Sequence, residues 1–241
     1  MTQSEARTAV IGAMPEEVAT LLPLLQNRDS FQVGPFELHD GFLDGHPVTL
    51  AVCGVGKANA AALTQAMLMH GCERVVFTGV AGGLDPALSV GDIVVSSDAV
   101  QHDVDVTALG YELGVVPGEE GVAWTADQQL AAIALEVAKE VVPDANVLMG
   151  RVASGDAFIA DDARVAELRT RFSAACAEME GAAVAQVCAR WGVPWVVIRS
   201  LSDAANGEAS MDFRAFTQLA AGRAEKVVRG VLARLSSERQ H

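Results

Sequence analysis

Short apolar runs alternate along the chain with longer alanine-rich runs, and this alternation constrains the fold more than any other feature. The runs RVVFT at 74–78 and WVVIRS at 195–200 are rich in β-branched and aromatic residues and have no polar face. A strand of this kind needs helices on both sides to cover it. The pattern therefore predicts an α/β sandwich in which helices flank a central sheet.

Turn residues and periodicity divide the chain into elements. Strands are expected at 8–13, in two or three segments between 31 and 53, and at 74–78, 92–100, 147–154 and 195–200. Helices are expected at 16–25, 56–71, 126–140, 163–172, 179–191 and 213–235, with a long polar loop from 101 to 121. Because no linker, repeat or low-complexity segment interrupts the pattern, we expect one domain over 1–241 with an ordered core at about 8–236.

Charge and composition argue against several classes of partner. The chain has 17 Lys and Arg against 31 Asp and Glu, a net charge of −14, which disfavours nucleic acids and anionic membranes. It has no apolar run near the roughly 20 residues of a spanning helix, and its N-terminus is unlike a signal peptide. We therefore expect a cytoplasmic protein. The cysteines lack metal-ligand spacing, since there is no C-x-x-C pair among Cys53, Cys72, Cys176 and Cys188.

Glycines and acidic residues follow the first predicted strands, where α/β proteins bind ligands. Glu16 and Glu17 begin a helix after the first strand, a position that the helix dipole alone also favours. The segment TGVAGGLDP at 78–86 would let backbone N–H groups approach a ligand, although an ordinary turn uses the same glycines. The turn GVGK at 54–57 is only a weak dinucleotide-binding signal.

Later strands carry a second set of candidates. Phe158 in SGDAF could stack on a planar base, or could simply pack in the core. Glu178 and Glu180 precede an apolar helix, and Asp203 follows an apolar strand, where it could also cap a helix. Buried carboxylates of this kind need partners and are candidates for perturbed pKa values.

Six segments together resemble one family. They are IGAMPEEV, TGVAGGLDPALSVGDIVV, HDVDVTALGY, SGDAFI, EMEGAAVAQVC and RSLSDAA. In this order they resemble the bacterial 5′-methylthioadenosine/S-adenosylhomocysteine nucleosidases of the nucleoside phosphorylase superfamily, from about residue 8 to the last helix. The resemblance implies a three-layer α/β/α sandwich with a mixed central sheet, and a homodimer without metal or organic cofactor. It also implies hydrolysis of the N-glycosidic bond of 5′-methylthioadenosine and S-adenosylhomocysteine, with 5′-deoxyadenosine as a further substrate, in methionine salvage and methyl-cycle recycling.

The resemblance assigns a role to each of three carboxylates. Asp203 would protonate adenine N7, Glu17 would deprotonate the attacking water, and Glu180 would accept hydrogen bonds from the ribose hydroxyls. The other substrate-binding residues that it implies are Val80, Ala81, Gly82, Phe158, Ile159, Glu178, Met179, Arg199, Ser202 and Phe213, together with Val106, Leu109 and Pro117 from the 103–120 loop of the partner chain.

The chemistry explains why these carboxylates must differ. Cleavage passes through an oxocarbenium-like state, so the leaving base needs a proton while the sugar gains positive charge. Asp203 must therefore stay protonated near neutral pH, which requires a raised pKa, whereas Glu17 must be ionised to accept a proton from water.

Two positions depart from the family pattern, and three alternative functions stay open. Leu109 stands where an aromatic residue is frequent, and Val80 where serine is frequent. Phosphorolysis would need arginines at the glycine turns, where Arg74 lies too early and only Lys57 is available. A nucleosidase acting on aminodeoxyfutalosine would use the same adenine and ribose contacts. A non-catalytic nucleoside-binding protein would bind adenine without releasing free sugar. The run His102-Asp103-x-Asp105 is expected to shape an interface loop rather than to bind a metal.

Overall fold

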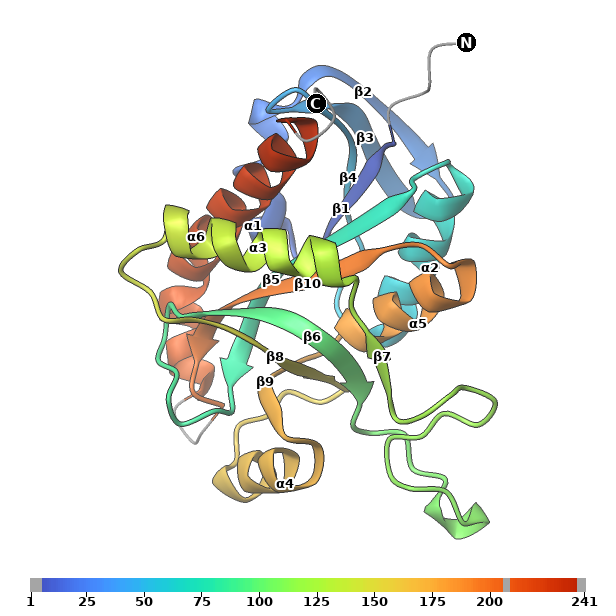
Figure 1. The fold of residues 1–241 in the computed structure, drawn as a ribbon, viewed down its shortest axis with the longest axis vertical. Coiled ribbons are helices and arrows are strands. Elements are labelled where there is room, and N and C mark those ends of the chain that lie inside the picture. Colours follow the sequence, from blue (N-terminus) through green and yellow to red (C-terminus); the bar gives the residue numbers. More distant parts are fainter. Residues whose placement is uncertain (1–5, 206–208, 238–241) are drawn as a thin grey trace.

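A mixed ten-stranded sheet forms the centre of the structure (Figure 1), a computed structural model that describes residues 6–205 and 209–237. The strands are β1 (Thr8–Gly12), β2 (Gln26–Val33), β3 (Phe36–Leu43), β4 (His46–Val52), β5 (Arg74–Gly83), β6 (Ile93–Gln101), β7 (Ala123–Thr125), β8 (Val147–Ser154), β9 (Ala174–Glu178) and β10 (Trp195–Asp203).

The sheet closes on itself at one side. Strands β4, β1, β5 and β10 run parallel, and β2 and β3 extend this part as an antiparallel meander. Strand β10 also pairs antiparallel with β6, which runs parallel to β8 and then β9. The end of β5 pairs in turn with β9, so β5, β10, β6, β8 and β9 form a ring. This closure brings the ends of β1, β5, β9 and β10 close together.

Helices cover both faces of the sheet, as the continuous apolar strands require. The α-helices are α1 (Pro15–Val18), α2 (Lys57–Met69), α3 (Gln128–Val141), α4 (Asp162–Phe172), α5 (Gly181–Trp191) and α6 (Ala209–Ser237), and the 3-10 turns are η1 (Leu22–Leu24) and η2 (Thr107–Leu109). One core cluster joins α2 and α5 to one face of the sheet, and a second joins α1, α3 and α6 to the other. A third cluster lies under α4, at the lower end in Figure 1. The expectation of an α/β sandwich with a mixed sheet is confirmed.

The predicted helix at 16–25 is wrong. Only α1 forms there, followed by η1, and β2 already begins at Gln26. Pro23 lies within the predicted span, and its ring and missing N–H prevent a continuous α-helix across it. Apolar spacing alone therefore overestimated the helix.

The glycine segment after 78 is also not a turn. Strand β5 continues to Gly83, where Gly82 and Gly83 pair with Ala177 and Cys176 of β9. A Cβ at Gly82 would come within 2.9 Å of an Asp203 carboxylate oxygen, so glycine here permits close approach of two strands. Strands β7 and β9 were missed because three and five residues give too little periodicity.

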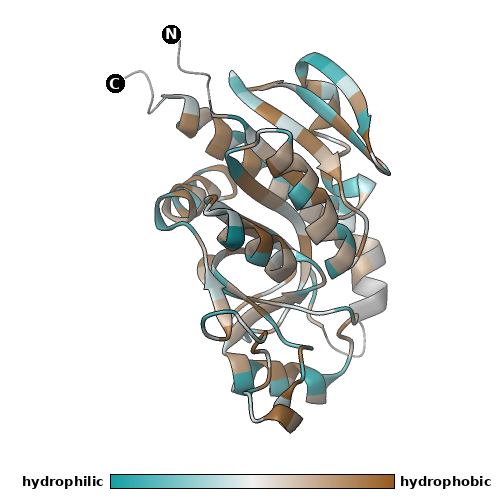
Figure 2. Ribbon diagram, turned by 90° about the vertical axis from the view of Figure 1, so that its right-hand side faces the viewer, coloured by the Kyte–Doolittle hydropathy of each residue, from teal (hydrophilic) through white to brown (hydrophobic). Residues whose placement is uncertain are grey.

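The loop between β6 and β7 projects away from the sheet. Its 3-10 turn η2 forms a hydrophobic tip at the far end of the molecule (Figures 1 and 2). Leu109 is 74% exposed there, and Tyr111 is 45% exposed. No helix in the described part of the chain is long and apolar enough to cross a bilayer.

Candidate active site

A cavity of about 430 Å³ lies where the ends of the central strands meet. Eleven of the residues singled out in the sequence line it, although they come from six separate segments. The lining residues are Ala13, Met14, Glu17, Val55, Val80, Ala81, Gly82, Phe158, Ala177, Glu178, Met179, Glu180, Ser202, Asp203 and Phe213. A recess of about 30 Å³ adjoins the cavity beside Asp203, and Ile159 lies there.

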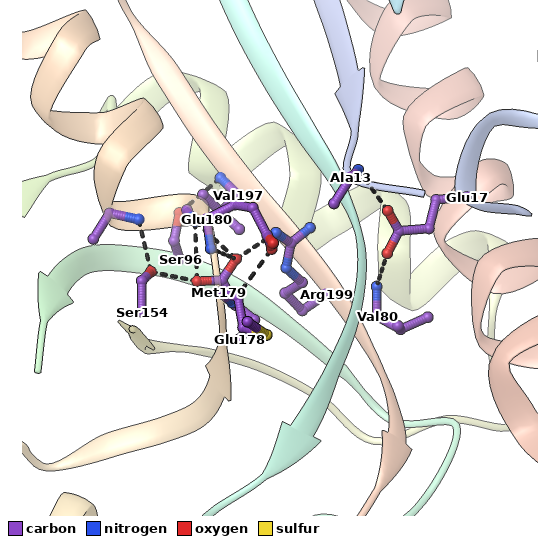
Figure 3. Close-up of polar contacts among 12 residues, drawn as sticks. Ala13, Glu17, Val80, Ser96, Ser154, Glu178, Met179, Glu180, Val197 and Arg199 are labelled. Carbon is purple, nitrogen blue, oxygen red and sulfur yellow. Dashed lines mark hydrogen bonds and ion pairs between the residues drawn. The ribbon is translucent and has the colours of Figure 1, made fainter. Parts of the chain in front are cut away.

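Glu17 is buried and held by three backbone N–H groups. Its Oε2 accepts from the N–H groups of Ala13 and Met14 at 2.6 and 2.9 Å, and its Oε1 accepts from the N–H of Val80 at 2.9 Å (Figure 3). Burial raises the pKa of Glu17, while Arg199 and these N–H groups oppose the rise. A carboxylate held in this way, with a raised pKa, suits a general base.

Glu178 and Glu180 form a second acidic group across the cavity. Glu178 accepts from the Ser154 hydroxyl and from the Gly181 N–H, and Glu180 accepts from the Gly56 N–H at 2.7 Å. Burial and the neighbouring Glu178 raise the pKa of Glu180 to about 8, although Arg199 and the Gly56 N–H oppose the rise. Glu180 therefore holds a proton at neutral pH in the free protein. We call Glu17, Glu178 and Glu180 the carboxylate wall.

Arg199 lies between the members of the carboxylate wall (Figure 3). Its Nη2 donates to Glu178 at 2.5 Å, and its guanidinium stacks 4.1 Å above the Phe77 ring. Its Nε and Nη1 have no hydrogen-bond partner among the described residues. With Glu180 protonated, the wall still has Glu17 and Glu178 against one arginine, and these acidic groups favour a ligand that gains positive charge.

Asp203 lines the same cavity from the end of β10. It is 2% exposed, and its oxygens accept from the Ser202 hydroxyl at 2.9 Å and from the Ala205 N–H at 2.8 Å. The predicted contact between Ser202 and Asp203 is thus present. The small recess beside Asp203 is also bordered by Phe158.

Two phenylalanines form the edge of the cavity, and we call them the aromatic rim. Phe158 is 49% exposed, and its ring meets that of Phe213 edge-on with the centroids 5.8 Å apart. The rings come from the turn after β8 and from α6. Core packing, the other use considered for Phe158, does not fit this exposure.

The loop residues predicted to act on the partner chain do not reach the cavity of their own chain. Val106, Leu109 and Pro117 are absent from the described lining, and Leu109 projects at the tip of η2. Their role depends on a second subunit and stays a prediction. Groups of three or more His, Cys, Asp or Glu that could hold a metal are absent from the described residues.

Sequence reasoning missed several residues of the site. Met14 and Val55 line the cavity, the Gly56 N–H holds Glu180, and Ser154 holds Glu178. Each one lies within a segment that the sequence did single out, although none of them was assigned a role in the site. Their contacts, however, span up to 124 residues of chain and have no local signature.

Comparisons with known proteins identify the family of this chain. The family model described as "Phosphorylase superfamily" matches residues 7–233. A 5′-methylthioadenosine/S-adenosylhomocysteine nucleosidase of Geobacillus sp. is 42% identical over 95% of this chain and 99% of the relative. The solved nucleosidase of Neisseria meningitidis, in complex with methylthio-immucillin-A, is 37% identical with a TM-score of 0.91, over 95% of this chain and 99% of that one.

A further solved structure is similar to nearly the same degree. Futalosine hydrolase of Helicobacter pylori is 34% identical with a TM-score of 0.90, over 95% of this chain and 98% of that one. The chain belongs to the phosphorylase superfamily and, within it, to the family of the 5′-methylthioadenosine/S-adenosylhomocysteine nucleosidases.

Proposed function

We propose that the protein hydrolyses the N-glycosidic bond of 5′-methylthioadenosine and S-adenosylhomocysteine, releasing adenine and the thio-substituted ribose. The observation that carries the proposal is that Asp203 lines the same cavity as the three members of the carboxylate wall. A hydrolytic displacement at a glycosidic carbon requires an acid and a held base within one site.

The residues divide the work as follows. Asp203, oriented by Ser202, donates a proton to adenine N7 and turns the base into a neutral leaving group. Glu180 binds the ribose hydroxyls, and the acidic wall stabilises the positive charge that develops on the sugar. Glu17 takes a proton from the attacking water, and the backbone N–H groups on its oxygens keep its carboxylate in place.

Residue 80 is valine where serine is frequent in the family, and Glu17 keeps its hydrogen bond to this residue. Its contribution is the backbone N–H that Glu17 accepts at 2.9 Å, and this contact is independent of the side chain. The water in this protein is therefore positioned without a hydroxyl at residue 80.

Hydrolysis is favoured over phosphorolysis by the charge of the lining. A phosphate nucleophile needs cationic partners, yet the described lining contains four carboxyl groups and no lysine or arginine. Arg199 is 1% exposed and already paired with Glu178. A phosphate dianion in this cavity would face net repulsion.

The finer expectations belong to the same proposal. The protein works as a cytoplasmic homodimer in methionine salvage and methyl-cycle recycling, and Val106, Leu109 and Pro117 of each 103–120 loop complete the 5′-substituent pocket of the partner. The same contacts would accept 5′-deoxyadenosine. Exposure of Leu109 and Tyr111 supports the loop contact, since buried apolar area stabilises subunit interfaces.

The test is adenine release from methylthioadenosine in phosphate-free buffer, followed by chromatography and repeated with phosphate. Release without phosphate, with free methylthioribose as the second product, supports hydrolysis. Release only with phosphate identifies a phosphorylase, and adenine binding without release identifies a binding protein. Parallel assays with S-adenosylhomocysteine, 5′-deoxyadenosine and aminodeoxyfutalosine rank the substrates by kcat/KM.

A further inference from the structure

The start of helix α2 is capped by residues far away in the sequence. Its N-cap is Gly56, at φ 100°, which has no side chain to accept from the free N–H groups of the first turn. The Gly56 N–H instead donates to Glu180 at 2.7 Å, and the Lys57 N–H donates to Asp156 at 2.9 Å. The first turn of α2 is thereby fixed to the carboxylate wall and to the turn that carries Phe158.

Asp103 joins the same group of contacts at the start of the 103–120 loop. Its Oδ1 accepts from Lys57 Nζ at 2.6 Å, and its Oδ2 accepts from the Asp156 N–H at 2.9 Å. Lys57 Nζ also donates to Gln101 at 3.1 Å. Lys57, Asp103 and Asp156 therefore contact one another in a closed ring, which we call the loop clamp.

The chemistry of the loop clamp depends on charge. Burial alone would raise the pKa of Asp103, but the Lys57 ammonium and the Asp156 N–H outweigh it and lower the pKa. The two side chains are 17% and 26% exposed, so the ion pair is screened less than a fully exposed one. The contacts of the loop clamp join the first turn of α2, the start of the 103–120 loop and the turn before Phe158.

We propose that the pair of Lys57 and Asp103 positions the substrate-binding residues Glu180 and Phe158 relative to the 103–120 loop. Neither residue of the pair lines the cavity, so the effect passes through the Gly56 N–H to Glu180 and through Asp156 to the turn before Phe158. The inference rests on the proposed function for the identity of the substrate, but not for the contacts themselves.

The test is a double-mutant cycle of Lys57→Met, Asp103→Asn and the double variant, with Lys139→Met on the exposed face of α3 as the matched control. We expect each single variant to raise KM for methylthioadenosine about tenfold, the equivalent of about 1.4 kcal/mol. The rise in KM should exceed the fall in kcat, because the reacting groups themselves are unchanged. The double variant should resemble the worse single variant rather than their product, since the two residues act as one unit.

A second measurement tests the clamp without turnover. Hydrogen exchange at the Gly56 and Asp156 amides should be faster in both single variants than in the wild type or in Lys139→Met. KM within twofold of the wild type, unchanged exchange at these amides, or effects that multiply in the double variant would each overturn the proposal. If the wild type releases no adenine, the proposed function fails, and the exchange rates still decide the clamp.

Discussion

The carboxylate wall and the aromatic rim border one cavity but are held in different ways. Each member of the wall is at most 8% exposed, and each accepts at least two hydrogen bonds from backbone or buried groups. Phe158 of the rim is 49% exposed and contacts Phe213 only edge-on. The acidic groups are thus held by hydrogen bonds from strand ends and helix starts, whereas the groups with only apolar surface lie on a turn and a helix.

The difference follows from the cost of misplacing each group. A carboxylate that moves by an ångström loses its hydrogen bonds in a buried site, which costs several kcal/mol. An aromatic ring can tilt and still bury most of its area against a flat ligand. We therefore expect changes in the polar groups to act mainly on kcat and changes in the rim to act mainly on KM.

The largest effect is expected from Asp203→Asn. The amide cannot donate the proton that the leaving base needs, so kcat should fall by roughly 10²–10⁴-fold or more. The Ser202 hydroxyl and the Ala205 N–H can still reach the side chain, so the fold should persist. Steady-state kinetics of Asp203→Asn, compared with the wild type and with the control Asp144→Asn at an exposed position, would measure this fall in kcat. Near-wild-type turnover would remove Asp203 from the mechanism.

The next largest effect is expected from Glu17→Gln. One of the two oxygens becomes an NH₂ group that must face an N–H donor of Ala13, Met14 or Val80, and the general base is lost. We expect kcat to fall by about 10²-fold or more. Glu16→Gln is the matched control, because the neighbouring side chain is exposed. A rise in KM alone, with kcat preserved, would contradict the role of Glu17 as the base.

A moderate effect is expected at the aromatic rim. Phe158→Ala removes the ring that would stack on adenine, worth about 1–3 kcal/mol for a base on an aromatic side chain, so KM should rise by about 5- to 150-fold. Phe158→Tyr keeps the ring and should stay within a few-fold of the wild type. Adenine affinity measured by calorimetry should change in parallel. If Phe158→Ala lowered kcat by a larger factor than it raised KM, the carboxylate wall and the aromatic rim would not differ in the way that we expect.

The smallest effect concerns the dependence of stability on pH. The pKa of Glu180 is about 8 in the folded protein against an ordinary value of 4.5, so between these values the folded state binds the extra proton. Stability of the free protein should therefore fall as the pH rises through this window. In Glu180→Gln this part of the slope should vanish, which thermal melts at pH 5, 6, 7 and 8 would measure. An equal slope in both proteins would show that Glu180 is ionised throughout.

The sequence and the structure agree best where a pattern is long and local. Strand β8 ends where predicted, and α2, α4 and α5 begin and end within about two residues of their expected bounds. The helix at 16–25 failed because Pro23 interrupts a pattern that spacing alone would continue. Strand β9 was missed because its five residues are recognisable only by their pairing with β8 and β5.

The sequence by itself determined the class of fold and the chemical groups available to the site. Apolar strands without a polar face demand a covered sheet, and the acidic segments at their ends supplied Glu17, Glu180 and Asp203. Only the tertiary structure decided which groups meet. The Val80 N–H reaches Glu17 across 63 residues, and the Gly56 N–H reaches Glu180 across 124. Periodicity records contacts between residues that are near in the chain, whereas these contacts depend on strand order and on the closure of the ring, which no single segment encodes.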